Sequence, residues 1–160
     1  GGYEIGPVIM APGDRERLEL RLMLFYTGLQ RHSSEIAAAQ IANVGRKEKE
    51  LHAIQALVPK AVDALIDGRL NDFGGLLHET WILKRELSDK VSTVAIDHLY
   101  ARALAAGAVG GKVLGAGGGG FMLFYVPPGR HDDVRAALQG LLEIPFKFGH
   151  TGSQVIHYDP

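Results

Sequence analysis

Leucines occupy every second position from Leu18 to Leu24. This two-residue period continues to Tyr26 and predicts a β-strand over residues 18–26. Thr27 and Gly28 then break the pattern, and the apolar spacing lengthens to that of amphipathic helices. Helices are predicted over four stretches, which are residues 33–44, 47–68, 71–87 and 92–107.

Residues typical of helix ends support these four stretches. Short polar side chains at a helix start accept hydrogen bonds from free backbone N–H groups, and glycine favours helix ends. Pro59 is expected to kink or divide the second helix. The expected N-caps are Ser33 or Ser34, Asn71 or Asp72, and Ser92 or Thr93, and the expected helix ends are Gly68 and Gly107. The expected inward stripes are Leu51, Ile54, Leu57, Val58, Val62, Leu65 and Ile66, and then Leu76, Leu77, Thr80 and Leu83.

After Gly107 the pattern returns to short β-type runs. Strands are predicted over residues 110–115 and 121–126, a helix over 130–142, and extended segments over 146–149 and 153–158. This order suits an α+β fold, in which a small antiparallel sheet of about four strands carries helices on one side. We expect one domain over residues 18–160, preceded by an N-terminal segment, residues 1–17.

Composition and charge limit the possible classes of function. The 160 residues are 46% hydrophobic and 22% charged, with a formal net charge of −1, which is ordinary for a globular protein and gives no basic surface for nucleic acid. The absence of cysteine excludes disulfides and a thiol nucleophile. No apolar run approaches the roughly 20 residues that cross a bilayer. We therefore expect a cytoplasmic protein without membrane contact.

The histidines do not show the spacing of a metal site. The segment HETWI has Ile82 where the zinc motif His-Glu-x-x-His has its second histidine. His150 and His157 are an odd number of residues apart, which places them on opposite faces of a continuous strand. We expect no metal bound by this chain alone.

All residues from Gly115 to Gly120 are glycine except Ala116. The spelling GxGxxG is that of a dinucleotide site, but such a site needs a following helix, and here the run FMLFYV predicts a strand. A P-loop does not fit either, since Val113 follows Lys112 where that motif needs a hydroxyl. Two interpretations stay open: a simple hairpin turn, or a wide turn without side chains that packs against phosphates or another loop.

The segment GGKVLGAGGGGF, residues 110–121, resembles the third, C-terminal signature of the GHMP superfamily of sugar and metabolite kinases, which includes galactokinase, homoserine kinase and mevalonate kinase. Leu114 and Phe121 replace the commoner Thr and Cys, and are similar to the branch of D-glycero-D-manno-heptose phosphate kinases. LFYTGLQRHSSEI, HETWILKRELS and GSQVIHY resemble that branch in order and spacing. The resemblance covers residues 18–158.

The resemblance implies the C-terminal, ferredoxin-like domain, with extra helices, of a two-domain ATP-dependent sugar kinase. The N-terminal domain of such kinases carries a phosphate loop of the type Pro-x-x-x-Gly-Leu-x-Ser-Ser-Ala, the catalytic acid and the magnesium ligands, and this string is absent here. We expect no catalytic residue in this chain, ATP and Mg²⁺ bound mainly by the missing domain, and residues 1–17 at the junction with it. Phosphoryl transfer depends on a complete site, so this chain alone is expected to be inactive.

The resemblance also implies which residues line the site. The basic position before the loop is Lys112, and the loop near the ATP phosphates corresponds to Gly115, Gly117, Gly118, Gly119 and Gly120. A strand-to-helix junction with an arginine can hold a sugar phosphate. The expected substrate-binding residues are Thr27, Gly28 and Arg31 at this junction, and Lys84.

Structural roles stay open for the charged candidates. Lys112 could point to solvent or pair with a carboxylate, Arg31 could be a surface or capping residue, and Lys84 could complement a helix dipole. We expect Trp81 in the core rather than as a platform for a sugar ring.

Other functions also stay open. They are a kinase for another sugar such as fucose or galactose, a non-catalytic module that binds a small anion, and an interaction domain whose glycine loop contacts a protein. The expected partners are a sugar phosphate, ATP and the chain's own N-terminal domain. An apolar face toward that domain predicts self-association.

Overall fold

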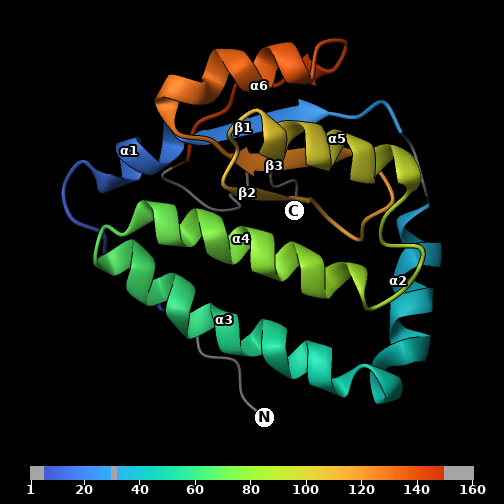
Figure 1. Ribbon diagram of the computed structural model, residues 1–160. Helices are drawn as coiled ribbons and strands as arrows, with labels where there is room; N and C mark the ends of the chain where they lie inside the picture. The colour runs from blue at the N-terminus through green and yellow to red at the C-terminus, as the bar shows by residue number, and fades with distance from the viewer. Residues whose placement is uncertain (1–5, 30–31, 150–160) are drawn as a thin grey trace, which may run out of the picture.

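An antiparallel sheet organises the computed structural model, which describes residues 6–29 and 32–149 (Figure 1). Its four strands are β1 (Leu22–Tyr26), β2 (Gly110–Val113), β3 (Phe121–Tyr125) and β4 (Leu142–Glu143), and they lie in the order β2-β3-β1-β4. Neighbouring strands are antiparallel throughout. This order is that of the ferredoxin-like motif, which confirms the α+β prediction.

Helices cover one face of the sheet and lie along one edge (Figure 1). The face is covered by α5 (Val94–Ala105) and α6 (His131–Ala137), the edge strand β2 contacts α4 (Leu70–Arg85), and α3 (Glu48–Ile66) packs along α4. The remaining helices are α1 (Asp14–Glu19) before β1, α2 (Ser33–Asn43) after it, and the 3₁₀ turns η1 (Val44–Arg46) and η2 (Pro128–Arg130).

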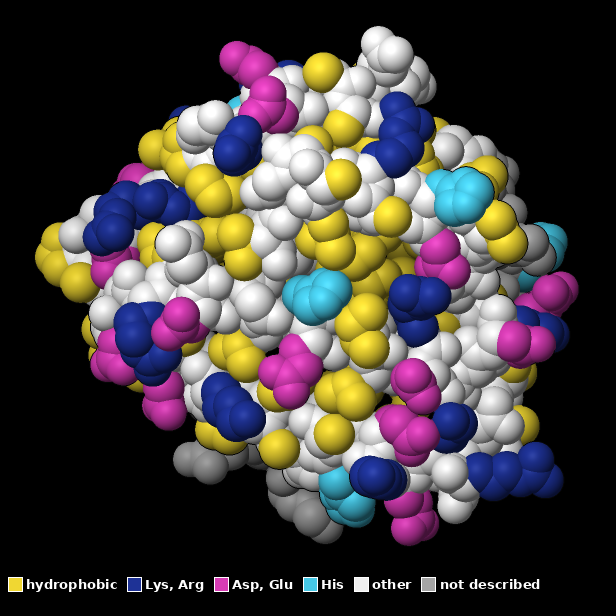
Figure 2. Space-filling view, in the orientation of Figure 1, with side chains coloured by type: hydrophobic (Ala, Val, Ile, Leu, Met, Phe, Trp, Pro, Cys, Tyr) yellow, Lys and Arg dark blue, Asp and Glu magenta, His cyan; other side chains and the backbone are white. Residues whose placement is uncertain are grey.

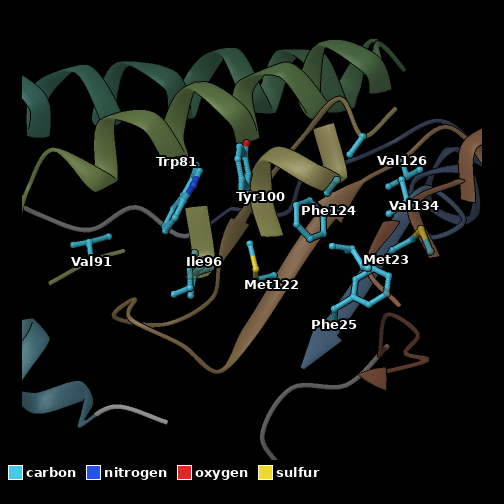
Figure 3. Close-up of a cluster of buried hydrophobic side chains, with 14 of the residues drawn as sticks. Met23, Phe25, Trp81, Val91, Ile96, Tyr100, Met122, Phe124, Val126 and Val134 are labelled. Atoms are coloured by element: carbon cyan, nitrogen blue, oxygen red, sulfur yellow. The ribbon is translucent and has the colours of Figure 1, made fainter. Parts of the chain in front are cut away.

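The main core lies between the sheet and the helices α4, α5 and α6 (Figure 3). Phe25 of β1 and Phe124 of β3 point into it, because alternate residues of a strand face the same side. Trp81 of α4 is fully buried and its ring centroid lies 6.0 Å from that of Tyr100 in α5. The expectation that Trp81 belongs to the core is confirmed.

Glycine residues, which have no side chain, allow α4 to approach β2 closely. A Cβ at Gly110 of β2 would meet the Gly74 carbonyl of α4, and a Cβ at Gly74 would lie 2.5 Å from the ring of Tyr125. Gly110, the first glycine of the glycine-rich segment, therefore serves helix packing.

The first predicted strand is wrong in its N-terminal part. Leu18 lies in α1, and β1 begins only at Leu22. The Arg21 N–H donates to the Leu18 carbonyl in the turn between them. Leu18 is buried against Leu70 and Tyr125 in a second cluster, so its apolar character reflects packing from a helix and the alternation was coincidental.

The predicted boundaries near the C-terminus are also wrong. The helix predicted over residues 130–142 ends at Ala137, Leu142 begins β4, and residues 146–149 form no strand. The segment 153–158, with His150 and His157, lies outside the described residues.

One predicted N-cap is confirmed and the others are wrong. The Ile96 N–H donates to Thr93 Oγ1 at 3.2 Å at the start of α5. The cap position of α2 is His32, so Ser33 and Ser34 are already helical. The cap position of α4 is Arg69, which leaves Asn71 and Asp72 inside the first turn.

The predicted stripes are confirmed only in part. Leu57 of α3 is buried, but Val58 and Ile66 are 58% and 47% exposed, and α3 continues through Pro59 as one helix. The stripe of α4 is half-buried, while the fully buried positions of that helix are Leu70, Gly74 and Trp81.

Candidate phosphate site at the glycine loop

The glycine loop, residues 114–120, joins β2 to β3 and lies between two other loops. The Gly118 N–H donates to the Val91 carbonyl, between α4 and α5, at 2.8 Å. The Gly120 N–H donates to the Leu29 carbonyl, after β1, also at 2.8 Å. Three segments that are distant in sequence are thus held together at one end of the sheet.

Close backbone contacts require glycine at two positions of this loop. A Cβ at Gly117 would lie 2.5 Å from the Val91 oxygen, and a Cβ at Gly119 would meet the Leu29 oxygen. The loop is therefore a wide turn packed against other loops, which was one of the two open interpretations. The N–H groups of Gly118 and Gly120 donate to carbonyls within the protein, and contact of the five loop glycines with a phosphate stays a prediction.

Thr27 connects β1 to the end of the glycine loop. Its side chain is buried, its Oγ1 donates to the Gly120 carbonyl at 2.8 Å, and it accepts a hydrogen bond from the Leu29 N–H at 3.2 Å. Gly28 beside it is exposed, with a φ of 72°. Arg31 lies outside the described residues. Thr27 is thus placed to hold the loop, and its contact with a substrate stays a prediction.

Lys84 approaches the loop from α4. Its Nζ donates to the Gly115 carbonyl at 2.5 Å. Burial, and then the nearby charge of Lys112, lowers the pKa of Lys84 to about 8. Lys84 and Lys112 are both half-buried, and neither forms an ion pair within residues 6–29 and 32–149. The structure therefore places two half-buried lysines near the start of the glycine loop, close enough for the charge of one to act on the other.

A cavity of about 340 Å³ opens beside this loop. Its volume is in the range of small-molecule sites. Its walls come from β1, the start of α2 and the loop, through Tyr26, Leu29, Ser33, Leu114, Gly115, Ala116, Gly117, Gly119 and Gly120.

The site also contains residues that the sequence interpretation did not include. Gln40 of α2 donates from Nε2 to the Ala116 carbonyl at 2.9 Å. The sequence signal that could have indicated Gln40 is its polar side chain directly after three alanines in the predicted helix. Leu29 and Val91 take part through backbone carbonyls, which every residue has, so their types carried no signal.

Several other kinds of site receive no support from the part of the chain that is described. Its His, Asp and Glu side chains form no group of three suited to a metal ion. None of its helices is long and apolar enough to span a bilayer. On the face in Figure 2, Lys and Arg side chains are interspersed with Asp and Glu, so this face has no extended basic patch for nucleic acid.

Comparison with known proteins identifies the family. Residues 61–143, more than half of the chain, match the family described as GHMP kinases C terminal. The chain belongs to this family, whose fold the sheet order and the helices share.

Individual relatives are kinases of sugars and of another small metabolite. The chain is 32% identical over 125 residues to a D-glycero-alpha-D-manno-heptose 7-phosphate kinase of Campylobacter jejuni, covering 76% of this chain and 37% of the relative. It is 31% identical over 135 residues to a mevalonate kinase of Pyrococcus horikoshii, covering 76% of this chain and 38% of the relative. The chain thus spans less than two fifths of the length of these curated relatives.

A solved structure of a heptose kinase shows the same fold. A D-glycero-D-manno-heptose 1-phosphate kinase of Bacteroides thetaiotaomicron superposes with a TM-score of 0.59 and 26% identity. The match covers 89% of this chain and 37% of that structure.

Proposed function

We propose that this chain works as the C-terminal part of an ATP-dependent kinase that phosphorylates a heptose phosphate. The observation that carries the proposal is the lysine pair at the glycine loop, in a chain whose family is that of GHMP kinases. Two uncompensated cations beside a cavity favour a ligand with several negative charges. ATP and a sugar phosphate are such ligands.

In this proposal the chain forms one wall of the reaction site. A hydroxyl oxygen of the sugar bonds to the γ-phosphorus of ATP, the bond to the ADP oxygen breaks, and the hydroxyl proton leaves to a base outside this chain. Phosphoryl transfer is catalysed mainly by positioning and charge stabilisation. Glycine-loop residues would lie near the ATP phosphates, with Lys112 and Lys84 supplying positive charge and Thr27 fixing the end of the loop.

Magnesium would be held by the rest of the kinase. The described residues offer no set of metal ligands, whereas Mg²⁺ usually binds carboxylates and substrate phosphates. We place the kinase in the cytoplasm, and residues 1–17 at the junction with the N-terminal domain. This chain alone would leave ATP unreacted.

The test measures transfer of the γ-phosphoryl group from ATP by the full-length gene product. The acceptors offered are heptose 7-phosphate, heptose 1-phosphate, fucose and mevalonate. Formation of ADP and a heptose bisphosphate supports the proposal, and turnover of fucose or mevalonate alone would instead establish a kinase of another substrate. Gly117→Ala should lower kcat/KM about tenfold or more by displacing the loop. Gly45→Ala, where a Cβ has open space, is the matched control.

A non-catalytic module that binds a small anion is the second candidate. It is favoured by the same lysine pair, which can hold an anion without any catalytic group. No transfer to any acceptor, together with binding of a phosphate compound by this chain, would establish it.

A further inference from the structure

Lys84 and Lys112 are half-buried, and their charge is not balanced by a neighbouring carboxylate as it is at the ion-paired arginines of the fold. Arg69 contacts Asp67 and Asp72, and Arg135 contacts Asp132 and Glu143. Surface cations of this kind have their charge neutralised by neighbouring carboxylates. The two lysines have no carboxylate partner in residues 6–29 and 32–149, although both are half-buried.

We propose that Lys84 and Lys112 together bind one phosphate group, and that this pair makes the site select phosphorylated ligands over neutral ones. The identity of the reaction rests on the proposed function, but the binding of phosphate does not. The ligand class is a phosphate monoester or a polyphosphate with two negative charges on the bound group.

The energetics of the pair favour such a ligand. Like charges held close together in a partly buried place repel each other, and a dianion between them removes that repulsion while accepting hydrogen bonds. An ammonium group has three donors, and the bond from Lys84 to the Gly115 carbonyl uses one of them. The other two are available to a ligand. A neutral sugar hydroxyl offers no comparable compensation.

The pair lies next to the cavity, whose lining includes Gly115 but neither of the two lysines. Gly115 accepts the hydrogen bond from Lys84 and also lines the cavity beside the loop. Lys112 belongs to β2, which leads directly into the loop. A phosphate bound by the pair therefore lies at the start of the loop, at the edge of the cavity.

The experiment titrates inorganic phosphate into this chain while NMR follows the lysine Cε signals, with Lys84→Arg used to assign the signal of Lys84. Without an anion the pKa of Lys84 is about 8. Phosphate should raise this pKa toward the ordinary value of 10.5, because an adjacent anion favours the charged form. An unchanged pKa at saturating phosphate overturns the proposal.

Variants separate binding from folding. Lys84→Gln and Lys112→Gln should each weaken phosphate binding about tenfold or more, as expected for loss of a charge-assisted hydrogen bond. Lys84→Arg, which keeps the charge, should retain most of the affinity. Lys60→Gln, at an exposed position of α3, should leave binding unchanged. Equal losses in Lys60→Gln and Lys84→Gln would refute the lysine pair, and thermal melting of each variant verifies that it is folded.

Two further titrations identify the source of the phosphate. Heptose 7-phosphate and ADP are added separately, with free heptose as the neutral comparison. A rise in the pKa of Lys84 with only one of the phosphorylated ligands assigns the pair to that ligand, and a rise with free heptose contradicts the proposed selectivity. Failure of all these titrations refutes phosphate binding by the pair and removes its support for the proposed function, whereas the kinase activity itself is tested separately by turnover.

Discussion

The substitution Gly117→Ala tests why the loop between β2 and β3 is rich in glycine. The new Cβ would lie 2.5 Å from the Val91 oxygen, and the φ of Gly117 is 117°. The unfavourable backbone conformation costs about 1–2 kcal/mol, and the forced movement of the Val91 segment adds about 1–3 kcal/mol. We expect the free energy of unfolding to fall by about 2–5 kcal/mol, which is a large part of the stability of a domain.

Gly115→Ala is the matched control for this prediction. Gly115 also has a positive φ, of 72°, but its Cβ would meet nothing within 4 Å. Its expected cost is the backbone term alone, about 1–2 kcal/mol. Urea denaturation of both variants measures the difference, and an unchanged m-value verifies that the denatured states are comparable. Equal losses of stability in the two variants would show that the contact with Val91 does not determine the residue at position 117.

Three other predictions concern the core and the site. Trp81→Ala should lower the free energy of unfolding by about 3–5 kcal/mol, since Trp81 is fully buried. Ile82→Ala, at a position that is 39% exposed, should lower it far less. Similar losses for the two variants in urea denaturation would refute the assignment of Trp81 to the core. Thr27→Val should cost about 1–3 kcal/mol, because it removes two part-buried side-chain hydrogen bonds, so that the Leu29 N–H loses its partner and the Gly120 carbonyl keeps the Thr27 N–H as a donor. An unchanged unfolding midpoint would contradict this. Between about pH 8 and pH 10.5, the lowered and the ordinary pKa of Lys84, the Lys84 amine binds more protons in the unfolded chain than in the folded one. Lys84 therefore contributes a rise of the free energy of unfolding with pH across this window. The free energy of unfolding of the unsubstituted protein should gain relative to that of Lys84→Met as the pH rises, and identical pH profiles of the two proteins would refute the buried environment of this lysine.

The sequence predicted most of the architecture because the relevant signals are local. Helical periodicity located α2 to α5, and the hydroxyl of Thr93 predicted the start of α5. The strand before Thr27 and the strands around the glycine cluster were also found from short apolar runs. Boundaries were less predictable, as Leu18 shows, because an apolar residue at an alternating position can equally be buried from a helix.

The composition of the glycine loop was informative, but its contacts were not. The motif spelling indicated the kinase family, which the match to residues 61–143 confirms. Val91 and Leu29 contact the loop through backbone oxygens, and no residue type signals that. Lys84 and Lys112 belong to different elements, and only the packing of α4 beside β2 brings them close enough to interact.

The most direct test of the account is a crystal structure of the full-length protein with heptose 7-phosphate and a non-hydrolysable ATP analogue. The account predicts ligand phosphates against the glycine loop, with at least one phosphate oxygen within hydrogen-bond distance of Lys84 or Lys112. Ligands bound with all their phosphates distant from residues 114–120 and from both lysines would contradict it.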